Sequence, residues 1–391
     1  MNIYNLKCLG SGAKMMAMLL LNLLSGNAQG NYPVRISAAW NEEKQEILTR
    51  ANWLCEKIDV DSESLLRLYP SFIGSMYVGQ WAIYTCSMLV AALHNISRLY
   101  PEERAWAIDS MVKPIEHALT PALRRFDAED WKEDPLDGVK GNKGHFTYLT
   151  SIAWMIGVYR LAGGDCRFDN TLHDCCDGIN KRMSSGKDMN VVSFRNNIVF
   201  ISDMVLACVA LQNYAKLFGC QYAETARRWL EMAKKELIHK PTGLLMAEKR
   251  YRWNPRVRGS YTALTNYYLT LLDDKEFARD QYDRMVKVFR RQKPYAGIKE
   301  FLRQGDGFKF DMNAGPMLYG LSTSGTALAI GTATFFEDWE YRNQMLLTAD
   351  ALAQTTKSSA KCHYRLAEVA PVGEAFVLAM RTNIDFDNAR L

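Results

Sequence analysis

Two kinds of segment alternate along the chain, and both have the length of helices. Six segments are apolar on nearly every face, and each follows a polar, mostly glycine-containing stretch. They begin, at intervals of 51 to 65 residues, near Gly79, Gly144, Arg195, Arg258, Asn313 and Gly373. An interval of this size fits one helical hairpin, so the pattern indicates a six-fold repeat of hairpins.

Six further segments carry charge on one face at helical spacing. They cover about 40–58, 102–125, 169–183, 221–238, 274–292 and 337–356. A helix that is apolar all round is buried, whereas a helix with one apolar stripe lies on the outside. No stretch of comparable length has the alternation of a strand. The sequence therefore predicts an all-α fold of two concentric helical rings, an (α/α)6 toroid.

The connections between these segments differ in length. Links from an apolar to an amphipathic segment are short, as at 99–101 and 218–219, whereas the return links run to roughly 12 to 20 residues. Long loops in a compact domain usually have a function. Because every apolar helix points the same way, all six long loops open at one mouth of the toroid. We expect that mouth to be the binding face and to enclose the largest polar cavity.

Composition and charge narrow the class of protein. The 391 residues are 48% hydrophobic and 23% charged, the balance of a globular protein with a large core. The net charge of +5 is not concentrated in any run, so no nucleic-acid partner is predicted. Nine cysteines are present without a Cys-x-x-Cys pair, so neither a metal site nor a cofactor is expected. Disulfide and oligomeric states stay open.

The N-terminus has the pattern of an export signal. Lys7 and Lys14 precede the apolar run 15–24, and small residues follow up to Ala28. The run is too short for a membrane span. We expect residues 1–28 to be a signal peptide, residues 29–391 to form one domain, and the protein to be periplasmic or extracellular. An N-terminal helix that is disordered or packed on the core is the alternative.

Three segments resemble a known superfamily. They are 144–146 and 258–260, each leading into an apolar helix, and Asp311-Met312-Asn313-Ala314-Gly315-Pro316. The mature chain resembles the (α/α)6 toroid superfamily of six-hairpin glycosidases, polysaccharide lyases and linalool dehydratase/isomerase-like proteins. The resemblance implies the toroid fold but matches no complete catalytic motif, and fold alone does not give function.

Three residues in the long loops are candidates for catalysis. Loops two and five lie opposite each other in a ring of six, so Asp137 and Asp311 can face one another over a ligand, as glycoside hydrolysis requires of two carboxyl groups. His145 directly precedes an apolar helix, where it can act as a general base. Asp311 also suits the N-cap of a helix beginning near Asn313, and His145 also suits a structural role.

Other loop residues are candidates for holding a ligand. Helix N-termini at the mouth, together with arginines, favour an anionic or strongly polar ligand, and aromatic faces suit sugar rings. The candidate binding residues are Tyr77, Trp81, Arg195, Trp253, Arg258 and Glu374.

Three functions fit these features. The first is an exported carbohydrate-active enzyme, a glycoside hydrolase or lyase, that acts on a polar and perhaps acidic sugar. The second is a dehydratase or isomerase of a small hydroxylated molecule, which predicts a narrower, apolar cup with thiols or His145 near the ligand, so that Cys166, Cys175 or Cys176 reaches the cavity. The third is a binding protein without catalysis. In each case the partner is a small molecule or an oligosaccharide.

Overall fold

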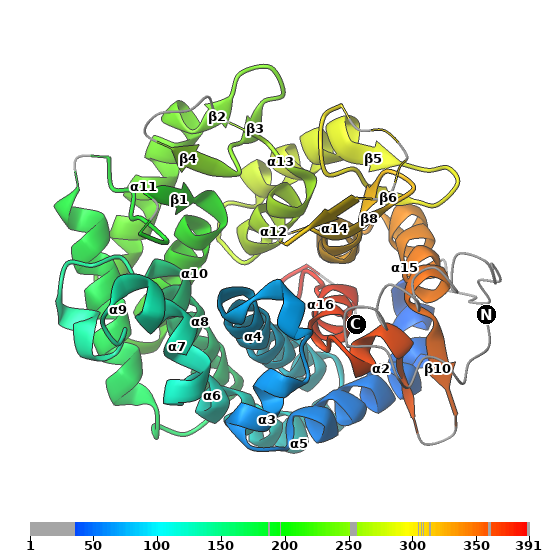
Figure 1. The fold of residues 1–391 in the computed structure, drawn as a ribbon, viewed down its shortest axis with the longest axis horizontal. Coiled ribbons are helices and arrows are strands. Elements are labelled where there is room, and N and C mark those ends of the chain that lie inside the picture. The colour runs from blue at the N-terminus through cyan, green and yellow to red at the C-terminus, as the bar shows by residue number, and fades with distance from the viewer. Residues whose placement is uncertain are drawn as a thin grey trace.

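The protein is a closed ring of helical hairpins. The computed structural model describes residues 36–186, 188–195, 197–250, 256–303, 305, 307, 309–312, 314–358 and 361–388. Figure 1 shows the inner ring, in which each helix contacts the next and the last contacts the first. The inner helices are α4 (Ser75–Leu99), α8 (Phe146–Ala162), α10 (Ile201–Phe218), α12 (Gly259–Thr270), α14 (Thr323–Phe335) and α16 (Val372–Arg381).

An outer ring covers the inner one (Figure 1). It consists of α2 (Ile36–Ile58), the broken run α5 (Arg104–Ser110), α6 (Val112–Ala118) and α7 (Pro121–Trp131), then α9 (Asp169–Ser185), α11 (Tyr222–Glu236), α13 (Lys275–Phe289) and α15 (Trp339–Ala353). The short α3 (Ser62–Arg67) joins α2 to α4. The predicted toroid of six hairpins is confirmed.

The two rings differ in burial as their sequences predict. All of α8 is buried except Arg160 and Leu161, so it has no solvent face. In α13 the buried residues recur every three or four positions and form a single stripe. Two of the tight links begin with glycines in the left-handed region, Gly163 at φ 107° and Gly219 at φ 65°, a conformation that other residues rarely adopt.

Short antiparallel strands occupy the long loops, where the sequence predicted none. They form the pairs β1 (Ile198–Phe200) with β4 (Glu248–Arg250), β2 (Ile238–His239) with β3 (Leu244–Leu245), β5 (Arg290–Arg291) with β6 (Gly297–Ile298), and β10 (Thr355–Lys357) with β11 (Cys362–Tyr364). A three-stranded sheet joins β7 (Lys309–Asp311), β8 (Gly315–Leu318) and β9 (Leu321–Ser322). Strands of two to four residues are too short to show a period.

Because of these strands, two inner helices begin later in the sequence than predicted. The third inner helix begins at Ile201 rather than near Arg195, because β1 precedes it. The fifth begins at Thr323 rather than near Asn313, and Ser322 caps it by accepting the Gly325 amide at 3.1 Å. The expected capping role of Asp311 is therefore wrong. Its carboxylate instead accepts the Ala314 amide at 3.0 Å in the turn between β7 and β8.

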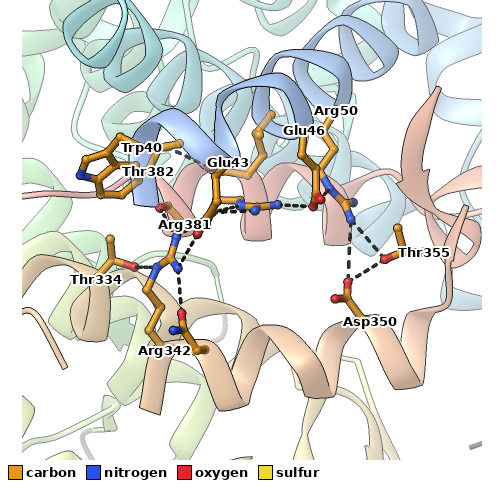
Figure 2. Close-up of polar contacts among 12 residues, drawn as sticks. Trp40, Glu43, Glu46, Arg50, Thr334, Arg342, Asp350, Thr355, Arg381 and Thr382 are labelled. Carbon is orange, nitrogen blue, oxygen red and sulfur yellow. Dashed lines mark hydrogen bonds and ion pairs between the residues drawn. The ribbon is translucent and has the colours of Figure 1, made fainter. Parts of the chain in front are cut away.

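Buried ion pairs close the ring between its first and last helices (Figure 2). Glu43 of α2 accepts hydrogen bonds from Arg342 of α15 at 2.9 and 3.0 Å and from Arg381 of α16 at 2.6 Å. Glu46 accepts from Arg381 at 2.9 Å and from Arg50 at 3.1 Å. These charges thus hold α2 against α15 and α16.

Among the described residues, α4 is the one helix long and apolar enough to cross a membrane. It belongs to the inner ring, and 72% of its most apolar stretch is buried inside the protein.

Candidate functional site

A cavity of about 400 Å³ lies at the mouth where the inner helices begin. Each of these six helices contributes residues from its N-terminal half, represented by Tyr77, Thr147, Asp203, Ser260, Thr323 and Glu374. The cavity therefore lies at the predicted mouth. Its character differs from the expected polar one, because most of the other lining residues are apolar or aromatic, among them Met76, Trp81, Phe194, Phe200, Leu264 and Phe376. We call this cavity the cup.

Asp203 is the carboxyl group in the cup whose surroundings favour its neutral form. It lies in the first turn of α10 and is 5% exposed. Burial raises the pKa of Asp203 to about 6, although hydrogen bonds from Thr147 and Ser193 act in the opposite direction. The Thr147 hydroxyl donates to its Oδ2 at 2.5 Å. A carboxyl group with a pKa near neutrality can give up a proton during catalysis.

Glu248 is a second carboxylate on the same wall. Pairing of β1 with β4 sets Phe200 opposite Glu248. Phe200 lies three residues before Asp203 in the sequence. The ring of Phe200 stacks on that of Tyr261, with the ring centroids 5.1 Å apart. Burial is the largest cause of the raised pKa of Tyr261, and the charges of Asp203 and Glu248 also contribute to it. Glu248 is held by Arg250, which donates to its two oxygens at 3.0 and 3.1 Å.

Arg258 and Asp311 form an ion pair beside the cup. Arg258 Nη2 lies 2.9 Å from Asp311 Oδ1, and Arg258 Nε donates to Glu300 at 2.6 Å. Burial and the nearby Asp311 raise the pKa of Tyr77, so the phenol stays protonated. Tyr77 and Arg258 line the cup, whereas Asp311 is not among the lining residues. The structure thus brings three predicted residues together, with Asp311 engaged by a cation.

Two further predicted binding residues line the cup. Trp81 is half-buried and belongs to its aromatic wall. The side chain of Glu374 is fully buried. Arg50 donates to its Oε1 at 2.8 Å, and the backbone amide of Tyr364 donates to its Oε2 at 2.7 Å. These partners occupy both oxygens of Glu374, so it joins the cup to the ion pairs of Figure 2.

Three further predicted site residues, His145, Asp137 and Arg195, do not line the cup. His145 is fully buried, with Nδ1 paired to Asp127 and Nε2 lying 3.3 Å from Glu133 Oε2. Asp137 is exposed in a short 3-10 turn that contacts α9, so the expected pair with Asp311 across the cavity does not form. Arg195 is exposed, and its amide donates to Asp130 at 2.9 Å. Trp253 lies outside the described residues.

The thiols do not reach the cup. No cysteine is among the described residues that line it. Cys175 and Cys176 are buried in the outer helix α9, and burial raises the pKa of Cys175 to about 12. Cys166 is exposed. The dehydratase or isomerase hypothesis placed a thiol or His145 near the ligand, and none of these residues lines the cup, whereas the apolar lining agrees with that hypothesis.

Comparison with solved structures agrees with this architecture. A family 105 glycoside hydrolase from C. acetobutylicum aligns with 76% of this chain and 92% of its own, at 10% identity and a TM-score of 0.50. An unsaturated glucuronyl hydrolase specific for heparin aligns with 77% of this chain and 85% of its own, at 10% identity and a TM-score of 0.49. The chain is an (α/α)6 toroid of the six-hairpin glycosidase-like fold.

A similarity this distant identifies the fold alone. An α-mannanase of glycoside hydrolase family 76 from Bacteroides thetaiotaomicron also aligns, with 77% of this chain and 85% of its own, at 9% identity and a TM-score of 0.45. No protein-family profile and no curated protein sequence matches the chain. The reaction has to be argued from the toroid's own cup.

The sequence analysis missed Asp203 and Glu248. Asp203 is an acidic residue near the start of an apolar inner segment, and burial of an unpaired carboxylate is costly. That contrast was visible in the sequence and marks Asp203 as a candidate. Glu248 carried no such contrast, because it stands in the polar run Glu248-Lys249-Arg250. Its place on the wall of the cup depends on the pairing of β4 with β1.

Proposed function

We propose that this protein is a carbohydrate-active enzyme that hydrolyses a glycosidic bond in the cup, with Asp203 as the general acid. The observation that carries the proposal is a buried carboxyl group, with a pKa of about 6, in a cavity lined by aromatic rings. Sugars present apolar C–H faces to such rings and hydroxyl groups to the few polar side chains. The fold is compatible with this chemistry but does not prove it.

The proposed reaction uses two carboxyl groups. Asp203 donates its proton to the glycosidic oxygen as the bond to the anomeric carbon breaks. Glu248 is our candidate for the second carboxylate, because the pairing of β1 with β4 brings it next to Phe200 and both acids influence Tyr261. It takes a proton from the water that adds to the anomeric carbon. Thr147 positions Asp203 through its hydrogen bond.

Substitution of the acid tests the proposal. Oligosaccharides of known composition are screened for the release of reducing ends, and the active substrate is then offered to Asp203→Asn and Asp311→Asn. We expect Asp203→Asn to lower kcat by about 100-fold or more while the substrate still binds. Asp311→Asn, at the Arg258 pair, is the matched control and keeps most of the activity. A fully active Asp203→Asn enzyme, or a loss confined to Asp311→Asn, would overturn the assignment.

We also propose that the enzyme is exported. The support is the charged, then apolar, then small-residue order of residues 1–28. Expression of the full chain in a bacterial host, followed by N-terminal sequencing of the extracytoplasmic fraction, is expected to give a mature protein that begins at Gln29. Recovery of the uncut chain from the cytoplasm alone contradicts export without affecting the proposed chemistry.

A further inference from the structure

The two cations that line the cup are already neutralised by carboxylates. Arg250 donates two hydrogen bonds to Glu248. Arg258 contacts Glu300 and Asp311, at 2.6 and 2.9 Å. Among the described lining residues these are the only arginines or lysines. A ligand carboxylate that approached either one would meet a guanidinium whose charge is already shared with a carboxylate of the protein.

Two further carboxyl groups line the cup, and their oxygens accept hydrogen bonds from neutral donors. Asp203 is held by the hydroxyls of Thr147 and Ser193. Asp130 accepts the backbone amide of Arg195, whose guanidinium donates to the backbone carbonyl of Asp130. A second negative charge brought next to an ionised carboxylate is repelled, and the repulsion is stronger at a partly buried site than in solution.

Three of the six helix N-termini at the cup already have an acidic side chain beside them. The Ser260 amide, in the first turn of α12, donates to Glu300 at 3.0 Å. Asp203 and Glu374 are acidic residues within the first turns of α10 and α16. The partial positive charge of these three helix ends is thus already balanced by side chains of the protein.

We propose that the cup takes an uncharged saccharide and excludes rings that carry a carboxylate. The inference rests on the proposed function, because it concerns the substrate of the same site. It replaces the acidic sugar that the sequence allowed. It also favours hydrolysis over elimination, because a polysaccharide lyase removes a proton beside a uronic carboxylate and needs a cation to neutralise that group.

Matched pairs of ligands test the inference. Tetrasaccharides of glucose, galactose and mannose are compared with tetrasaccharides of glucuronate, galacturonate and mannuronate, and the Kd of each is measured by calorimetry near neutral pH. We expect a neutral ligand to bind about tenfold or more tightly than its uronate counterpart. Ala327→Trp, which fills the cup from α14, is expected to abolish this binding.

A pair of charge variants separates local from general repulsion. Asp130→Asn removes a carboxylate that lines the cup, and we expect it to shift the ratio of the two Kd values severalfold toward the uronate. Glu129→Gln makes the same change in net charge one residue earlier, outside the cup in a separate hollow between α3, α4 and α7. It should leave the ratio unchanged.

The outcomes of this experiment are distinct. A uronate that binds as tightly as its neutral counterpart, or more tightly, overturns the inference and leaves the proposed hydrolase intact. Equal shifts in Asp130→Asn and Glu129→Gln show that discrimination comes from overall charge and also overturn it. If no tetrasaccharide of either series binds, the proposed function fails and the inference fails with it.

Discussion

Asp203 is unfavourable for folding at neutral pH. Its pKa rises from 3.8 to about 6 on burial, so the folded state binds its proton more tightly than the unfolded state does. For an acid shifted in this direction, stability is greatest below the unfolded pKa and falls as the pH rises through the folded one. A residue that costs stability where it stands is typical of a functional site.

Asp203→Asn is therefore expected to stabilise the protein at neutral pH. The variant avoids burial of a charge, and a shift of two pKa units corresponds to about 3 kcal/mol at most. We expect a gain of about 1 to 3 kcal/mol in the free energy of unfolding at about pH 7.5, shrinking toward zero near pH 4. Urea denaturation at both pH values measures it. If the variant is less stable than the original protein at both pH values, the raised pKa of Asp203 has an origin other than burial.

His145 acts as a positioning residue rather than a catalytic one in the proposed mechanism. Its backbone is left-handed at φ 50°, it is paired on both ring nitrogens, and Thr147 follows two residues later. The pair of His145 with Asp127 fixes the start of α8. It thereby also fixes Thr147, whose hydroxyl donates to Asp203. The histidine is thus linked to the acid without touching the cup.

We expect His145→Asn to lower stability more than it lowers catalysis. Asparagine tolerates the left-handed backbone, but Asp127 loses a buried partner, which costs about 1 to 3 kcal/mol. Weaker support for Thr147 raises the pKa of Asp203, so the pH profile of kcat shifts upward with only a modest loss at its maximum. A fall in kcat as large as that of Asp203→Asn, with stability unchanged, would restore a catalytic histidine.

Among the elements of the fold, the start of α12 packs closely against the residues that follow β6. The Gly259 amide donates to the Glu300 carbonyl at 2.9 Å, and a Cβ at Gly259 would lie 1.9 Å from the carbonyl oxygen of Lys299. The close approach lets Glu300 reach both Ser260 and Arg258. Only glycine leaves room for this contact.

Gly259→Ala and Gly373→Ala are expected to act in opposite directions. In Gly259→Ala the new methyl group collides with backbone, and we expect a loss of about 1 to 3 kcal/mol. Gly373 lies in α16, where an added Cβ would have no other atom within 4 Å, so alanine there gains up to about 1 kcal/mol from helix propensity. Thermal and urea unfolding measure both. If Gly259→Ala leaves the free energy of unfolding unchanged, the segment that follows β6 can move away from the new methyl group.

At the scale of the whole molecule, the ion pairs of Figure 2 fasten the two ends of the chain to each other. Burial opposes the charge of Glu43, but Arg381 and Arg342 outweigh it and lower the pKa of that carboxyl. A depressed pKa contributes stability above the unfolded value that is lost as the pH falls through the folded one. The ring should therefore open under acidic conditions.

Removal of one cation from this network is expected to be costly. Arg342→Met leaves Glu43 buried with fewer partners, and we expect a loss of about 3 to 5 kcal/mol. Glu43→Gln is expected to lose stability at neutral pH and to show a shallower decline below about pH 4.5. Arg279→Met is the control, because Arg279 pairs with Asp283 at 3.1 Å on the surface, and its loss should cost less than about 1 kcal/mol. Equal effects of Arg342→Met and Arg279→Met would contradict a role in closing the ring.

The architecture of the protein could be predicted from its sequence. Apolar segments such as 146–159 cannot face water, and striped ones such as 275–289 cannot be buried on all sides, so hydrophobic pattern alone separated the two rings. The difference in loop length then gave the mouth at which the cup lies. Both features are local and repeat six times, which is why they could be read along one chain.

Which polar groups share the cup depends on contacts between segments that are distant in the sequence. Asp311 and Asp137 were expected to face each other, yet Asp311 pairs with Arg258 and Asp137 is exposed on a 3-10 turn. Asp203 and Glu248, 45 positions apart in the sequence, come to one wall through a short strand pairing that has no periodic signal. Burial then sets the pKa of Asp203, and burial is a property of the whole packed ring rather than of any segment of sequence.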